Sequence, residues 1–72
     1  MIATEDPHPL DAPVPALVSI QAHRDNATYL IIRDGEELIA LEPGERTEIP
    51  FSTAIEVCAL EGTAEYKAEY FR

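Results

Sequence analysis

The sequence predicts an all-β protein, a small antiparallel β-sandwich or a partly open barrel of about six short strands. Apolar residues alternate with polar ones over short runs, which is the period of a strand. Turn-forming Gly, Pro, Asn and Asp separate these runs at intervals of about six to ten residues. The 72 residues fit one domain, and they contain neither a heptad pattern nor an internal repeat.

The start of the chain differs from the rest, and we expect an extended N-terminal arm, residues 1–15, before a small β domain, residues 16–72. Four of the six prolines fall in this arm, at Pro7, Pro9, Pro13 and Pro15. Proline breaks a helix and lacks the donor that a sheet ladder needs, so we expect a polyproline-like conformation. A neighbouring subunit or a partner is expected to hold the arm, with Ile2, Leu10 and Val14 among the contacts.

The β domain opens with a predicted strand over residues 16–23. Its alternate positions carry small or aliphatic side chains, at Ala16, Val18, Ile20 and Ala22. Residues 24–27, Arg-Asp-Asn-Ala, are turn formers and end the strand. One face of this strand is therefore expected to turn toward a core.

A hairpin is predicted over residues 28–41, where two apolar runs flank Asp34 and Gly35. This dipeptide supplies the positive φ angles of a two-residue turn. The register that follows from such a turn sets Ile32 opposite Glu37. The hairpin is the strongest local signal in the sequence.

Both faces of this hairpin are apolar. One face carries Tyr29, Ile31, Leu38 and Ala40, and the other carries Leu30, Ile32, Ile39 and Leu41. An antiparallel strand that is half exposed to water shows one polar face, and a 72-residue chain has little room to cover two apolar ones. We therefore expect a protein partner to cover one face, and we assign the contacts to the second set.

Further strands are predicted beyond the hairpin. The residues Glu-Pro-Gly-Glu at 42–45 place Pro and Gly where a type II turn prefers them. Residues 46–51 form a strand that lies at a sheet edge or ends at Pro50, because proline cannot donate to a ladder. Residues 55–60 form another strand.

The C-terminal segment, residues 64–71, follows Glu-Gly at 61–62, which is a second candidate for a hairpin turn. Strict alternation favours a strand there, and a short helix with Tyr66 above Tyr70 is the alternative. If the two tyrosines fill the core, Phe71 faces outward. We predict it as a contact residue, because aromatic side chains anchor protein interfaces.

No pattern in the sequence is typical of a catalytic or cofactor site. The possible metal ligands His8, His23 and Cys58 lack the close spacing of a zinc site, so neither a metal nor a cofactor is expected. A nucleophile would need a basic partner, and the sequence has only 2 histidines. Cys58 lies in an apolar run and is expected to be a buried free thiol. We predict that the protein is not an enzyme.

The formal net charge is −9, from 14 acidic and 5 basic side chains. This argues against direct contact with nucleic acid, since phosphate-binding surfaces gather Lys and Arg. The N-terminal residues lack the basic and apolar regions of a signal peptide, and no window holds the roughly 18 apolar residues that span a bilayer. We expect a protein that is neither secreted nor inserted in a membrane.

The run from Ala27 to Leu60 resembles small β-sandwich accessory proteins of tailed-phage particles. Its strand, hairpin and strand are followed by Leu41-x-Pro-Gly-Glu and a further strand. Members of that group decorate or cement capsids or sit at the head–tail junction, and terminal arms are common among them. The resemblance implies a non-enzymatic structural protein of a virion, made in the host cytoplasm. Its implied partners are a capsid protein or further copies of itself, in a homo-oligomer or multi-copy assembly.

The resemblance transfers no functional residue, and the negative charge departs from it. Two other functions stay open. The charge favours an acidic mimic of nucleic acid that inhibits a host nuclease or repair enzyme, although the carboxylates are spread along every turn and strand. An adaptor domain of a bacterial complex is the third function, and no residue pattern distinguishes it.

Overall fold

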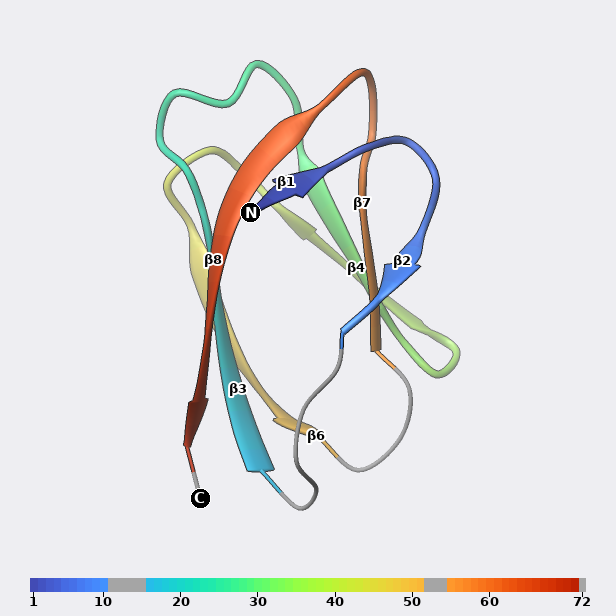
Figure 1. Ribbon diagram of the computed structural model, residues 1–72, viewed down its shortest axis with the longest axis vertical. Helices are drawn as coiled ribbons and strands as arrows, with labels where there is room; N and C mark the ends of the chain where they lie inside the picture. The colour runs from blue at the N-terminus through green and yellow to red at the C-terminus, as the bar shows by residue number, and fades with distance from the viewer. Residues whose placement is uncertain (11–15, 52–54, 72) are drawn as a thin grey trace.

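Two four-stranded antiparallel sheets pack face to face in the computed structural model, which describes residues 1–10, 16–51 and 55–71 (Figure 1). The β3 sheet has the order β1 (Ile2–Ala3), β8 (Ala64–Phe71), β3 (Ala16–Ala22) and β6 (Arg46–Phe51). The β4 sheet has the order β2 (His8–Pro9), β7 (Ile55–Ala59), β4 (Leu30–Asp34) and β5 (Glu37–Leu41). The all-β class is confirmed, with eight strands among the described residues where about six were expected.

The strands pair in a nested order. β1 pairs with β8, β2 with β7, β3 with β6 and β4 with β5. The pairs β3–β8 and β4–β7 complete the two sheets. This is the strand order of an eight-stranded jelly roll, in which consecutive strands alternate between the sheets except at the central hairpin.

Aliphatic side chains fill the space between the sheets. The largest fully buried ones are Val18, Ile20, Leu30, Ile32, Ile55 and Val57. They occupy alternate positions on β3, β4 and β7, which lie inside their sheets rather than at the edges. The period-two pattern that predicted these strands is therefore the pattern of core burial.

The β4–β5 hairpin is confirmed, but its turn lies one residue later than expected. The turn residues are Gly35 and Glu36, so Ile32 lies opposite Ile39 rather than Glu37. Gly35 has a φ of +64°, and no described residue other than glycine has a positive φ. One positive φ at the first turn position fits a type II′ turn, whereas type I′ needs two. Because each partner shifts by two positions, both faces keep their predicted members.

Residues 1–10 pack against their own domain, which corrects the expectation of an arm held by a neighbour. β1 pairs with β8 and β2 with β7, so the segment crosses from one sheet to the other along one side of the sandwich (Figure 1). Ala3 and Leu10 are buried, and the Leu10 N–H donates to the Ile55 oxygen at 2.8 Å. Edge strands tolerate proline because one side of their ladder is unused. Val14 lies outside the described residues.

The position of β6 at a sheet edge and the turn before it agree with the sequence prediction. β6 pairs with β3 alone and forms a sheet edge, as Pro50 predicted. The Glu45 N–H donates to the Glu42 oxygen at 3.0 Å across the type II turn, in which Gly44 has a φ of +90°.

β8 is a strand, so the helix alternative is wrong. The hairpin expected at 61–62 is also wrong, because β7 and β8 belong to different sheets.

Candidate interaction surface

The outer face of the β4 sheet is apolar. Ile31 on β4 lies between Ala40 on β5 and Cys58 on β7. Beyond them, Tyr29 and Leu60 lie side by side, since the Leu60 N–H donates to the Tyr29 oxygen at 3.0 Å. These residues alternate along the chain with core residues, so they point away from the other sheet. The surface, here called the outer apolar face, consists of Tyr29, Ile31, Leu38, Ala40, Cys58 and Leu60.

The large side chains of the outer apolar face are open to water. Leu38 is 65% exposed, Leu60 58% and Tyr29 42%. Ile31 and Cys58, in the middle of the face, are half-buried. Single exposed hydrophobic residues are ordinary, but a contiguous group of them marks an interaction site. The hairpin therefore places one apolar face in the core and leaves the other uncovered.

Charged side chains border the outer apolar face. Near the hairpin turn, Arg33 lies opposite Glu56, with 3.8 Å between Nη1 and Oε1. Glu42 and Glu61 are exposed at the other end. Ion pairs this open to solvent contribute little to stability. Because carboxylates outnumber cations among these residues, the border is acidic.

The outer face of the β3 sheet is polar by contrast. Two cross-strand rows on β6, β3 and β8 cover its centre, Glu48 with Ser19 and Glu69, and Arg46 with Gln21 and Lys67. Lys67 Nζ lies 3.3 Å from Glu69 Oε1. An apolar pair, Leu17 and Phe71, lies at the end of this face. Interspersed charges of both signs are typical of a solvated surface, so the two outer faces of the sandwich differ in kind.

Most hairpin residues predicted as contacts lie in the core. Leu30 and Ile32 are 0% exposed and Leu41 is 4% exposed, so they offer no surface to a partner in this fold. Ile39 is half-buried at the margin of the core. That assignment is corrected, and the surface left open is the opposite face. The alternation shows which residues share a face, but not which face turns inward.

The other predicted contacts are scattered. Leu10 is buried against its own chain, and Ile2 is 63% exposed on the edge strand β1. Phe71 is 47% exposed on the same side of β8 as Lys67 and Glu69, but Tyr70 on the other side is 36% exposed and does not fill the core as expected. Val14 is not among the described residues. These positions do not form one surface with the outer apolar face.

Cys58 and Leu60 belong to the outer apolar face, and neither was predicted as a contact. Cys58 was expected to be buried, but it is half-buried beside Ile31 on the outside of the sheet. The signal was present in the sequence, because Glu56, Cys58 and Leu60 occupy the strand positions that alternate with the core residues. What was missing was the pairing of β7 with β4.

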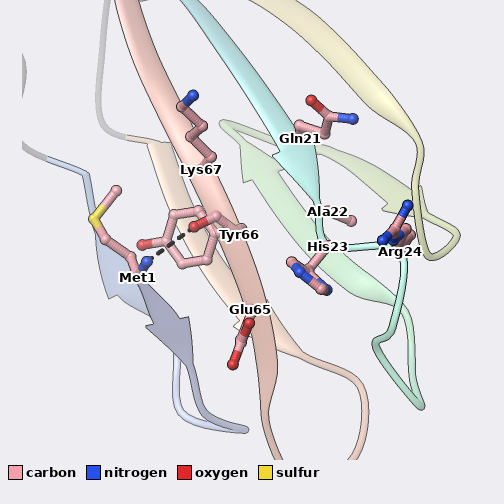
Figure 2. A pocket seen from close by; sticks show the side chains of 8 residues that line it. All are labelled: Met1, Gln21, Ala22, His23, Arg24, Glu65, Tyr66 and Lys67. Atoms are coloured by element: carbon pink, nitrogen blue, oxygen red, sulfur yellow. Dashed lines mark hydrogen bonds between the residues drawn. The ribbon is translucent and has the colours of Figure 1, made fainter.

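A hollow of about 480 Å³ opens beside β8 and the end of β3 (Figure 2). It is lined by Met1, Gln21, Ala22, His23, Arg24, Glu65, Tyr66 and Lys67. The Met1 amino group donates to the Tyr66 carbonyl oxygen at 3.0 Å, drawn as a dashed line in Figure 2. Burial raises the pKa of the Tyr66 phenol, and the nearby Tyr70 adds to the rise. Among the described residues this lining contains no serine, threonine or cysteine, although Thr63 lines a separate hollow together with His23.

The remaining chemistry-bearing residues lie apart. Ser19 and Cys58 are on opposite outer faces, and His23 Nδ1 accepts a hydrogen bond from the Asp25 N–H at 3.1 Å. His8, on β2, has its Nε2 3.5 Å from Thr4 Oγ1. In the part of the chain that the structure describes, no three His, Cys, Asp or Glu side chains gather as they would around a metal ion. The described residues also include no helix with the length and apolarity that crossing a bilayer requires.

Four of the connections between the sheets lie at one end of the sandwich (Figure 1), and they carry six carboxylates. The six are Glu5, Asp6, Asp25, Glu42, Glu45 and Glu61. Two of them hold loops in place. Glu5 Oε2 accepts from the Gly62 N–H at 2.7 Å, and Glu45 Oε1 accepts from the Glu42 N–H at 2.7 Å.

Comparisons with protein-family models, with curated proteins and with solved structures give no match. A functional proposal for this chain therefore depends on its own geometry. The most distinctive feature of that geometry is the contrast between an apolar and a polar outer face on the same sandwich.

Proposed function

We propose that the protein is a non-enzymatic structural protein of a phage-like particle, present in many copies and attached to the capsid. The observation that carries the proposal is the outer apolar face. Its exposed leucines and tyrosine form one connected surface, and covering each large apolar side chain contributes about 1.5–3 kcal/mol when burial is complete. We therefore expect a protein partner to cover this surface.

The architecture supports the proposal without selecting it. Jelly rolls occur in viral capsid proteins, in lectins and in cupins, so the strand order alone chooses no function. The short connections leave little chain for an active-site loop. In the described residues the functional signal is a surface rather than a cavity with catalytic groups.

The route of attachment differs from the one the sequence predicted. Residues 1–10 pair with β8 and β7 of their own chain. We assign the capsid contact to the outer apolar face instead. Its acidic border, with Glu42 and Glu61 at one end, fits a capsid surface whose apolar centre is ringed by Lys or Arg.

The test is incorporation into particles. Ile31→Glu places a charge in the middle of the outer apolar face, and it should leave the domain folded while removing it from density-purified particles. Gln21→Glu adds the same charge to the polar face of the β3 sheet and should be incorporated as the wild type is. Incorporation of Ile31→Glu at the wild-type level would contradict the proposal, as would the absence of the wild-type chain from the particles.

The carboxylates of the connections favour a second function, an acidic inhibitor that occupies the nucleic-acid site of a nuclease or repair enzyme. Six acidic side chains lie in the four connections at one end of the sandwich, although two of them already accept backbone hydrogen bonds. Such an inhibitor would bind a basic enzyme with affinity that falls steeply with salt. Asp25→Asn with Glu61→Gln would weaken it, whereas those changes should not alter incorporation into particles.

A further inference from the structure

Among the described residues four strands lie at sheet edges, and they differ in how well they are protected. β1 and β2 have two residues each, which is too short to template another strand. β6 carries Pro50 together with the charged Arg46 and Glu48. β5 has five residues, Glu-Leu-Ile-Ala-Leu, with no proline and no lysine. Of these four edge strands, β5 is therefore the one that lacks the usual protection against pairing with another chain.

The hydrogen-bond pattern between β4 and β5 determines which backbone groups of β5 are free. In a hairpin with a two-residue turn, the residues that flank the turn form a hydrogen-bonded pair, so Ile39 and Leu41 point their backbone groups at β4. Leu38 and Ala40 then point theirs at the open edge. The same alternation carries across the sheet to β7, where the Ile55 oxygen accepts from the Leu10 N–H on the far side.

The sequence of β5 is complementary to itself when two copies run antiparallel. With Ile39 opposite Ile39 of the second copy, Leu38 lies opposite Ala40 and Glu37 lies opposite Leu41. Leu38 and Ala40 are the residues with free backbone groups, so each copy offers two donors and two acceptors to the other. The two Glu37 side chains fall on opposite sides of the axis, and no like charges meet within the paired strands.

We propose that β5 pairs with β5 of a second copy about a two-fold axis at Ile39. The two β4 sheets then join into one continuous sheet, and the two outer apolar faces, which reach the edge at Leu38 and Ala40, become a single surface. Such an isologous contact closes on itself and gives a dimer. It goes beyond the capsid attachment, because it uses the backbone edge of β5 rather than the centre of the outer apolar face.

Charge repulsion sets the conditions for this pairing. Each copy has a formal net charge of −9. In the proposed register Glu36 at the hairpin turn approaches Glu42 of the second copy. Salt screens such repulsion over about 8–10 Å at physiological concentrations, so dimerisation should strengthen as salt is added. Attachment to a capsid surface rimmed by basic residues should instead weaken as salt is added.

The first experiment removes one edge donor. Ala40→Pro deletes an N–H that faces the open edge, while Ala40→Val keeps it and suits a strand. Sedimentation velocity in high salt should show dimers for the wild type and Ala40→Val, and monomers for a folded Ala40→Pro. Ile31→Glu should still dimerise, which separates this proposal from the capsid contact. A wild type that stays monomeric at millimolar concentration in high salt would overturn the pairing.

A second experiment reports the register even if Ala40→Pro fails to fold. In a Cys58→Ser background, Ile39→Cys places two thiols across the axis, where Cα atoms of such a pair are about 4.5 Å apart and a disulfide fits. Glu37→Cys, on the same strand, sets its thiols about 14 Å apart at roughly 3.4 Å per residue. Mild oxidation should yield a linked dimer at least tenfold faster for Ile39→Cys. Equal rates for the two variants would rule out the proposed axis.

Discussion

The side-chain amide of Asn26 pairs with the backbone of Glu65 in both directions. Asn26 Oδ1 accepts from the Glu65 N–H at 2.8 Å, and Asn26 Nδ2 donates to the Glu65 carbonyl oxygen at 2.9 Å. The amide thus pairs with the start of β8 as a strand residue would. The His23 N–H also donates to the Glu65 oxygen there. A loop residue 39 positions away in sequence fixes the start of the C-terminal strand.

Replacing Asn26 should destabilise the fold through this pair. Asn26→Ala removes both hydrogen bonds, and we expect a loss of about 1–3 kcal/mol in the free energy of unfolding. Asn26→Asp keeps the acceptor but sets a carboxylate against the Glu65 oxygen, so it should not restore stability. Urea denaturation measures both, and Asp25→Ala in the same loop is the control that should stay near the wild type.

The two neighbours Ile31 and Ile32 should differ sharply in their effect on stability. Ile32 is 0% exposed, and its truncation to alanine should cost about 2–5 kcal/mol, because it leaves a cavity in the core. Ile31→Ala, on the outer apolar face, should cost roughly 1 kcal/mol or less. Denaturation of the two variants under one set of conditions checks the orientation of β4. Similar losses for both would mean that Ile31 is also internal.

Gly44 should resist replacement by alanine. Its φ of +90° lies in a region that side chains rarely adopt, and an added Cβ would lie 3.7 Å from that of Arg24, an ordinary contact. Backbone strain rather than crowding therefore sets the cost, which we expect at about 1–2 kcal/mol. Gly44→Asn should cost less, because asparagine tolerates positive φ better. Melting temperatures of the two variants would show this order, and the reverse order would point to crowding.

Tyr66 should contribute to a loss of stability in alkali. Burial raises the pKa of its phenol, and the neighbouring Tyr70 raises that pKa further. The folded state therefore keeps the Tyr66 proton more tightly than the unfolded chain does. The stabilisation is complete below about pH 10, the unfolded value, and disappears as the pH rises through the folded-state pKa.

Tyr66→Phe removes this group, so its free energy of unfolding should fall less steeply as the pH rises above about 10 than that of the wild type. Tyr29→Phe, which changes an exposed tyrosine on the other sheet, is the matched control. A slope identical to that of the wild type would show that Tyr66 is not the group responsible.

Local patterns in the sequence determine much of this fold. Alternation over residues 16–22 and 55–59 predicts buried strands, and Pro-Gly at 43–44 predicts the turn that Glu42 and Glu45 close. These features depend on neighbours in sequence, where side-chain direction follows from strand geometry alone.

Long-range pairing is what the sequence does not disclose. Nothing local shows that β7 and β8 enter different sheets, that residues 1–10 provide two edge strands, or that Asn26 binds the Glu65 backbone. The prediction of the contact residues on the hairpin was wrong for the same reason. Both faces of the hairpin are apolar, so only the position of the second sheet decides that Ile32 is internal and Ile31 is external.

The central claim is that another protein covers the outer apolar face, and the thiol of Cys58 tests it most directly, because that thiol lies in the middle of the face beside Ile31. The measurement is its alkylation rate in the isolated protein and in purified particles. The account predicts at least tenfold protection in the particles. An equal rate in both, with the chain present and folded in the particles, would contradict it.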